Sequence, residues 1–333
     1  MKILQSGVAK SGNYWLWKIL DETLKYSNNE VKKFVTSTEE YDDILNSKKL
    51  SNIDQISSDV IDVDMTGYYW RISSYYKEKI PDLDSYIDQS THIWTHSEFC
   101  NSFNELQQKV DKIIYIVRDP RDVAISMANF AFTNYAKEAY PHHEKNVNDY
   151  IDKRIKWQTM TWNRHVSGWL SNDFDNMHII FYENLKSDFD EEYKKLIEFL
   201  NIELTDNDFK EIKNKVSADS MRKDSPGHVR KPSKKDWRSK LTDDQLKSAN
   251  SVCLDLLTLL GYQAERSLDN TQKPNFESNY NEIKKLYIKS NLSFKDNIDG
   301  FRNLLLSKRS LKDKMDVIRR KIISSLQVFL RKQ

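Results

Sequence analysis

Apolar and polar positions along the chain alternate between two kinds of segment. A short continuous apolar run at residues 113–117 is typical of a strand that is buried on both faces of a parallel sheet, and residues 177–185 predict a further buried strand. Segments 13–26 and 190–202 instead place apolar residues at helical spacing. Strands that alternate with helices predict an α/β fold, in which a parallel sheet is flanked by helices and ligands bind beyond the carboxyl ends of the strands.

Two later segments break this alternation. Residues 266–281 are polar and unpatterned, which predicts a linker after an α/β domain at 1–265. Residues 282–333 are expected to form a basic helical extension, with ten Lys or Arg residues and two Asp between 301 and 333. One helical face there would carry Leu311, Met315, Ile318, Ile322, Leu326 and Phe329. Such a helix could lie on an anionic membrane surface, pack against the α/β domain or mediate self-association.

Composition narrows the class of protein further. The 333 residues are 38% hydrophobic, and 52 basic against 50 acidic residues give a net charge of +2, which argues against a nucleic-acid-binding protein. Cys100 and Cys253 lie far apart without metal-ligand spacing, so neither a disulfide framework nor a zinc site is indicated. The first ten residues have too short an apolar stretch to predict a signal peptide, and no apolar run of about 18 residues predicts a membrane span. We expect a cytoplasmic protein, which the basic extension could hold at the inner face of the membrane.

The first strand-to-helix connection nearly matches a phosphate-binding P-loop. Gly7 and Gly12 keep the glycine spacing of G-x-x-x-x-G-K-[ST], but Asn13 and Tyr14 stand where Lys and Ser/Thr are needed, and a lysine lies inside the loop at Lys10. Backbone amides at the start of a helix attract anions. A kinase also needs a hydroxyl for Mg²⁺. The loop therefore predicts an anion site with no metal requirement.

Two later segments, residues 113–126 and 228–235, also contain basic residues that could bind an anion. Residues 113–126 repeat the order strand, loop and helix, with Asp119 as the expected helix cap, Pro120 at the first helical position and Asp122 completing an acidic variant of a capping box. Residues 228–235 form a basic loop, "HVRKPSKK". A solvated charge run is the usual explanation for such a loop, but after two anion sites it also fits a lid over a polyanion.

In this order the three segments resemble the signatures of the sulfotransferases that use 3′-phosphoadenosine-5′-phosphosulfate (PAPS). The family's loop over the 5′-phosphosulfate, P-K-S-G-T-T-W, is A-K-S-G-N-Y-W here. The resemblance implies that this loop holds the cofactor through Lys10, Ser11, Gly12, Asn13, Tyr14 and Trp15. It also implies that the 3′-phosphate is bound by Arg118, Ser126, Arg230 and Lys231. In the last segment Asp236 and Trp237 match as well, while Pro232 and Lys235 replace the family's two glycines.

Two further stretches agree with the family and extend the resemblance over about residues 1–263. "WNRHVSGW" is similar to a family helix, and "FYENL" to a strand end, which makes Tyr182 a candidate neighbour of the adenine. The family's second adenine-stacking aromatic corresponds to Ala218, preceded by Ser217, so adenine stacking at this position is lost or taken over by another ring.

The family also implies the chemistry of transfer. Its general base is a histidine after a strand, which corresponds to His96 with Thr95 before it, and His92 is the nearest alternative. A histidine has a pKa suited to taking a proton from an acceptor hydroxyl at neutral pH, while Lys10 would stabilise charge on the leaving phosphate. PAPS is then the donor, the bisphosphate PAP is the product, and no metal is required.

The acceptor itself is not named by the sequence. Aromatic residues are dense at 65–76 and 127–140, where they could line an acceptor pocket or fill the core. A carbohydrate, a lipid-linked hydroxyl compound, or a small alcohol or phenol would suit such a pocket. Two other functions stay open: an Mg²⁺-dependent P-loop phosphotransferase, against which Asn13 and Tyr14 count, and a non-catalytic nucleotide-binding module.

Overall fold

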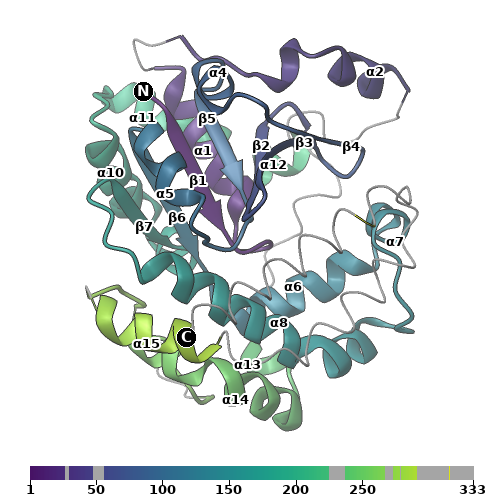
Figure 1. The fold of residues 1–333 in the computed structure, drawn as a ribbon. Helices are drawn as coiled ribbons and strands as arrows, with labels where there is room; N and C mark the ends of the chain where they lie inside the picture. The colour runs from purple at the N-terminus through teal and green to yellow at the C-terminus, as the bar shows by residue number, and fades with distance from the viewer. Residues whose placement is uncertain are drawn as a thin grey trace.

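The computed structural model describes residues 1–26, 30–47, 56–224, 237–266, 273–277, 279–290 and 315. A central seven-stranded sheet runs in the order β4-β3-β2-β5-β1-β6-β7, and helices lie on both of its faces (Figure 1). Its strands are β1 (Ile3–Gly7), β2 (Asp59–Asp64), β3 (Gly67–Ile72), β4 (Tyr76–Lys79), β5 (His92–Thr95), β6 (Lys112–Val117) and β7 (Met177–Phe181).

The predicted α/β class is confirmed, and the parallel part of the sheet comprises β2, β5, β1, β6 and β7. At one edge the sheet continues as an antiparallel meander, in which β3 pairs with β2 and β4 pairs with β3. The sequence pattern did not predict this edge. Its strands carry polar and charged residues, and their pairing is local because short turns connect them.

Along the chain, a helix follows each of the strands β1, β5, β6 and β7. The described helices are α1 (Asn13–Leu24), α2 (Glu39–Ser47), α4 (Leu83–Asp88), α5 (Phe103–Leu106), α6 (Pro120–Ala131), α7 (Asn134–Ala139), α8 (Val147–Leu170), α9 (Tyr182–Ser187), α10 (Phe189–Leu200), α11 (Asp206–Lys215), α12 (Ala218–Asp224), α13 (Trp237–Lys240), α14 (Asp243–Leu259) and α15 (Tyr280–Ser290), with short 3₁₀ turns at Val35–Ser37 and Gln107–Lys109.

Strand β6 shows how the two faces of the sheet are buried. Ile114 and Ile116 belong to a core formed with α1, α10 and α11. Ile113, Tyr115 and Val117 face a second core that includes residues of α5, α8 and α14. Both sets are fully buried because successive side chains of a strand point to opposite faces. This explains why the sequence of β6 is a continuous apolar run.

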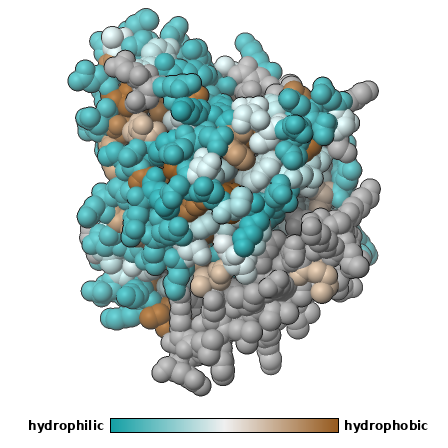
Figure 2. Space-filling model, turned by 45° about the horizontal axis from the view of Figure 1, so that its top comes forward, coloured by the Kyte–Doolittle hydropathy of each residue, from teal (hydrophilic) through white to brown (hydrophobic). Residues whose placement is uncertain are grey.

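The first part of the expected extension packs onto the α/β body. Helix α15 contacts α8 and α14, and its Ile283 is fully buried in the second core. Of residues 291–333 only Met315 is described, so the rest of the predicted basic amphipathic face lies outside the described residues, as do residues 267–272 and 278 of the predicted linker. On the face shown in Figure 2 the coloured residues are mostly hydrophilic, with apolar ones scattered among them. Among the described helices, none has the length and apolar character to cross a membrane.

Candidate active site

The loop between β1 and α1 has an unusual backbone that depends on glycine. Lys10 and Gly12 have positive φ angles of 72° and 97°. A Cβ atom on Gly12 would lie 2.5 Å from a ring carbon of Tyr182, so that ring packs directly against the loop. The spacing of Gly7 and Gly12 thus allows a tight turn and a close approach of an aromatic ring, as in other phosphate-binding loops.

Polar groups at this loop are arranged for an anionic ligand. No side chain caps the N-terminus of α1, where the helix dipole is positive. Within the described residues, Ser11 Oγ and Arg118 Nε are buried and have no hydrogen-bond partner. A buried donor without a partner costs about 1–3 kcal/mol. Both donors would be satisfied by the oxygens of a phosphate, so the residues present fit an anionic group here.

Arg118 connects the end of β6 to this loop. Its Nη1 donates a hydrogen bond to the carbonyl oxygen of Lys10 at 3.1 Å. Its guanidinium carbon lies 4.2 Å from the ring centroid of Tyr182, in a cation–π contact. The side chain of Trp162 fixes the strand end by donating to the Arg118 carbonyl at 2.9 Å. The first two predicted anion-binding segments therefore meet in space.

Helix α6 begins as expected and approaches the loop along one face. Asp119 caps it by accepting a hydrogen bond from the Arg121 amide, and Pro120 is its first residue. Asp122 does not complete a capping box, because it accepts a hydrogen bond from the Trp237 amide instead. Further along, Ser126 and Phe130 are four residues apart and share a face. Lys10 Nζ lies 4.2 Å from the Phe130 ring centroid, so the face that carries Ser126 points toward the loop.

On the other side of the loop lie the residues expected near the adenine. Trp15 donates from Nε1 to the Val216 carbonyl at 2.9 Å and packs edge-on against Tyr182, with ring centroids 5.9 Å apart. Ser217 is exposed and caps the start of α12, accepting from the Ser220 amide at 3.3 Å. A second ring, Phe189, stacks on Trp15 at 6.1 Å. The segment before Ala218 is thus held beside Trp15.

Two other predicted loop residues have mainly internal contacts. Asn13 donates from Nδ2 to the Val8 carbonyl at 2.7 Å. The Tyr14 ring stacks on Trp17 at 5.9 Å, within a small apolar cluster that includes Trp94. The remaining predicted anion-binding residues, Arg230 and Lys231, lie outside the described residues, as does Asp236.

His96 follows β5 and is bonded to the same loop. Its Nδ1 lies 2.7 Å from the carbonyl oxygen of Gly7, so Nδ1 carries the proton and Nε2 is left as the acceptor. The Trp94 ring packs edge-on against it at 5.2 Å. Burial lowers the pKa of His96 to about 3, and the Arg71 cation adds to this effect, while the contact with Gly7 opposes it. The imidazole is therefore neutral at neutral pH, with the lone pair of Nε2 available as a hydrogen-bond acceptor.

His92, the alternative base, lies elsewhere. It pairs with Ile3 at the start of β1, roughly 13 Å along the strand from His96 at the usual rise per residue. Its side chain is 7% exposed, and its Nε2 lies 3.1 Å from Gln5 Oε1. Burial lowers the pKa of His92 to about 4. This position is at the amino end of the sheet, away from the loop.

A buried carboxyl network beside Arg118 was not identified from the sequence. Glu183 accepts hydrogen bonds from the Asp119 amide at 3.0 Å and from the Tyr262 hydroxyl at 2.9 Å. Burial raises the pKa of Glu183 to about 7, although the hydrogen bond from Asp119 opposes this shift. The sequence signal was present in the "FYENL" match, but the partner Tyr262 is too far along the chain to be foreseen.

The two aromatic segments that were expected at an acceptor pocket do come together. Ser73, after β3, has its hydroxyl 2.7 Å from the Tyr135 hydroxyl of α7. The rings of Tyr75 and Tyr135 are 6.2 Å apart, and Tyr135 lies 6.1 Å from Phe130. Because Phe130 contacts Lys10, this aromatic group adjoins the loop.

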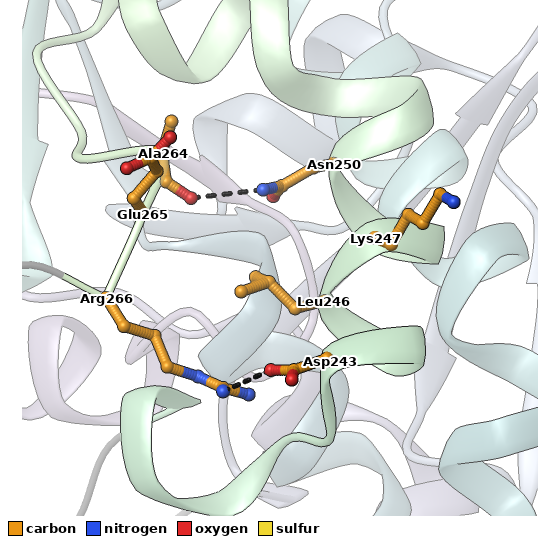
Figure 3. A pocket seen from close by; sticks show the side chains of 7 residues that line it. All are labelled: Asp243, Leu246, Lys247, Asn250, Ala264, Glu265 and Arg266. Carbon is orange, nitrogen blue, oxygen red and sulfur yellow. Dashed lines mark hydrogen bonds and ion pairs between the residues drawn. The ribbon is translucent and has the colours of Figure 1, made fainter.

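A separate surface pocket of about 380 Å³ lies along α14 (Figure 3). An ion pair between Arg266 and Asp243 crosses it, and Asn250 donates to the Ala264 carbonyl at 3.0 Å. Its described lining contains none of the residues predicted to bind the cofactor or to act in catalysis. We therefore place the candidate site at the β1–α1 loop.

The parallel sheet, the glycine loop after β1 and the histidine after the neighbouring strand β5 define an α/β protein with a candidate anion site at the carboxyl ends of its strands. The chain belongs to the sulfotransferase domain family, whose sequence model matches residues 1–261.

Individual relatives match over shorter stretches. Sulfotransferase 2A2 of Rattus norvegicus is 34% identical over 96 residues, which are 28% of this chain and 32% of the relative. Sulfotransferase 2A6 of Mus musculus is 26% identical over 163 residues, covering 43% and 55% respectively. The amine sulfotransferase of Oryctolagus cuniculus is 27% identical over 130 residues, covering 38% and 42%. The matched part thus spans between about a third and just over half of these relatives.

Two solved structures share the fold. Mouse sulfotransferase SULT7A1 in complex with PAP aligns with a TM-score of 0.51 and 20% identity, over 77% of this chain and 83% of that one. Retinol dehydratase in complex with androsterone and PAP aligns with a TM-score of 0.50 and 15% identity, over 77% and 80%. Identities this low support the architecture alone.

Proposed function

We propose that this protein transfers a sulfuryl group from PAPS to a hydroxyl group of an acceptor. The observation that carries the proposal is that the loop between β1 and α1 brings three side chains together: Lys10, Arg118 and His96. Lys10 lies in the loop, Arg118 donates to its carbonyl at 3.1 Å, and His96 is bonded to Gly7 at 2.7 Å. Two cations and a neutral imidazole therefore lie at the carboxyl ends of adjacent parallel strands, where α/β proteins bind ligands, and this supports the proposal.

The cofactor would be held by residues of the motifs. We assign the 5′-phosphosulfate of PAPS to the amides at the start of α1, the buried Ser11 hydroxyl and Lys10. The 3′-phosphate would be held by Arg118 and Ser126, together with Arg230 and Lys231. Tyr182, Trp15 and the segment at Ser217 flank the adenine. When bound, PAPS supplies the sulfuryl group, which carries a single negative charge. Asn13 and Tyr14 stand where a P-loop kinase has its lysine and the Ser or Thr that binds Mg²⁺, so we expect activity without metal.

His96 and Lys10 would divide the chemistry. His96 takes the acceptor proton at Nε2, because Nδ1 is engaged by the Gly7 carbonyl. Lys10 Nζ now rests on the Phe130 ring and would leave it to offset charge on the leaving phosphate oxygen. General-base help is worth about 10²–10⁴ in rate, and a well-placed charge stabiliser about 10²–10³. Binding of an anionic cofactor should also raise the pKa of His96, which strengthens it as a base.

The test is a calorimetric titration of the purified protein with PAP in EDTA, with ATP as the comparison. Metal-independent binding that requires the 3′-phosphate is expected. Binding of ATP that appears only with Mg²⁺, together with no binding of PAP, would instead identify a P-loop phosphotransferase. Binding of PAP without transfer of labelled sulfate from PAPS to any acceptor would indicate a non-catalytic module.

A further inference from the structure

A cluster of three tyrosines lies beside the proposed reaction centre. Tyr75 follows β3, Tyr135 belongs to α7, and Tyr140 directly follows α7. Their neighbouring ring centroids are 6.2 Å and 6.3 Å apart. Tyr75 and Tyr140 are 39% and 42% exposed, which places them among the few large apolar side chains that the described residues leave exposed. The β3–β4 hairpin and α7 lie on the same side of the molecule in Figure 1.

This tyrosine cluster is connected to Lys10 through one side chain. Phe130 lies 6.1 Å from Tyr135 and 4.2 Å from Lys10 Nζ. An acceptor with its reacting hydroxyl near Lys10 and His96 would therefore extend past Phe130 onto the tyrosine rings. Exposed aromatic rings next to a reaction centre provide flat apolar surface for a ligand.

Charged and polar side chains of the sheet edge lie next to these rings. Asp62 of β2 accepts a hydrogen bond from Arg71 Nε at 3.1 Å and forms an ion pair with Lys77, which stands opposite Arg71 on β4. Arg71 also donates to the Ser73 carbonyl at 3.0 Å. We call Asp62, Arg71 and Lys77 the charged triad. It lies close enough to His96 for Arg71 and Asp62 to influence the pKa of His96.

Hydroxyl groups lie between these charged side chains and the tyrosine rings. The Tyr135 hydroxyl lies 2.7 Å from Ser73 Oγ and donates to Ser74 Oγ at 2.9 Å. The side chains of Arg71 and Asp62 remain 21% and 27% exposed, so a ligand can reach them. Arg71 donates to described residues through Nε and Nη1, so its Nη2 could donate to a bound ligand.

These features favour one kind of acceptor. A wholly apolar acceptor would remove water from the charged triad and give no hydrogen bonds in return, which is unfavourable for buried charges. A sugar ring has an apolar face that can stack on tyrosines and hydroxyls that can bond to Arg71, Asp62 and the serines. We propose that the acceptor is a saccharide, bound between the tyrosine cluster and the charged triad. This inference rests on the proposed sulfuryl transfer and names its acceptor class.

The first experiment measures transfer from ³⁵S-labelled PAPS by the full chain. The acceptors are methyl glycosides and oligosaccharides, the same sugars as octyl glycosides, and two apolar alcohols, 2-naphthol and cholesterol. We expect kcat/KM to be highest for a saccharide. Preference for the octyl form would identify a lipid-linked sugar, and equal rates would identify a free one. Higher kcat/KM for 2-naphthol or cholesterol than for every saccharide overturns the inference.

The second experiment uses variants with the best saccharide. Tyr140→Ala and Tyr75→Ala should each raise KM about three- to tenfold, the value of one ring contact, with a smaller change in kcat. Ile288→Ala removes an apolar side chain of α15 that is 58% exposed and serves as the control, with unchanged KM. Unchanged KM in both tyrosine variants overturns the assignment of the rings.

Failure of this inference can be told apart from failure of the proposed function. Calorimetry with PAP tests the cofactor site alone and does not depend on the acceptor. If PAP binds and no saccharide is sulfated, the saccharide assignment is wrong while the cofactor assignment stands. If PAP does not bind, both are wrong.

Discussion

The His96 imidazole is hydrogen-bonded through Nδ1 to the carbonyl oxygen of Gly7, 2.7 Å away and 89 residues earlier in the chain. Gly7 is the last residue of β1, so the proposed base is fixed directly to the start of the anion-binding loop. The bond also selects the tautomer, because a carbonyl can only accept. In the proposed mechanism, this bond couples the position of the base to that of the loop that would hold the 5′-phosphosulfate.

From this relationship we expect His96→Asn to separate structure from chemistry. The asparagine amide can still donate to Gly7 but cannot act as a base. Turnover should fall about 10²–10⁴-fold while affinity for PAP stays within about twofold. His96→Ala loses the bond as well and should also weaken PAP binding. Near-normal turnover in His96→Asn would show that another group takes the proton.

Lys10→Met should lower kcat about 10²–10³-fold, because in the proposed mechanism Lys10 supplies charge at the leaving phosphate oxygen. The substitution keeps an unbranched side chain at a residue with a φ of 72°. Lys25→Met, which removes an exposed cation at the end of α1, is the matched control and should leave kcat unchanged. Single-turnover assays at saturating PAPS provide the comparison. Equal kcat for Lys10→Met and Lys25→Met would remove Lys10 from the mechanism.

Arg118→Ala should chiefly weaken cofactor binding. A charged hydrogen bond to phosphate contributes about 1.5–3 kcal/mol, so the dissociation constant for PAP should rise about 10- to 150-fold. The effect should be much smaller for adenosine 5′-monophosphate, which lacks the 3′-phosphate. Lys213→Ala, at an exposed ion pair with Asp190, should not change either affinity. An equal loss for both nucleotides would place Arg118 away from the 3′-phosphate.

Gly12→Ala should destabilise the protein more than Gly67→Ala. Both glycines have positive φ, 97° and 129°, so both substitutions strain the backbone at about 1–3 kcal/mol. At Gly12 the added methyl also meets the Tyr182 ring at 2.5 Å, whereas at Gly67 the nearest atom is 3.4 Å away. Urea unfolding of both variants measures the difference. A similar free energy of unfolding for the two would mean that Tyr182 moves away without cost.

His92 should make stability depend on pH in a predictable direction. Its folded pKa of about 4 lies below the unfolded value near 6.5, so the unfolded chain binds more protons between these limits. The contribution of neutral His92 to the free energy of unfolding is therefore fully present above about pH 6.5. It falls by about 1.4 kcal/mol per pH unit toward pH 4.

Comparison with His92→Gln isolates this contribution from other titrating groups. At pH 7.5 the variant should be less stable, because His92 packs on Trp17. The gap in the free energy of unfolding should shrink by about 2 kcal/mol at pH 5. A gap that does not change with pH would mean that the pKa of His92 is the same in the folded and unfolded protein.

The sequence by itself determined the α/β alternation, the loop at Lys10 and Gly12, and the cap at Asp119. These features depend on local rules: strand and helix periods, the backbone freedom of glycine and the capping of a helix by its own neighbours. The family resemblance added Arg118, Ser126 and Tyr182, and the structure places Arg118 and Tyr182 together at 4.2 Å.

Only the tertiary structure decided which distant groups meet. The bond from His96 to Gly7 exists because β5 pairs with β1 in parallel, and Arg118 reaches Lys10 because β6 pairs with β1 on the other side. The charged triad follows from the antiparallel edge, whose register sets Arg71 opposite Lys77. Local sequence patterns do not encode such register between strands. The anion-binding loop was therefore readable from the chain, whereas the surroundings of the base and the proposed acceptor site required the fold.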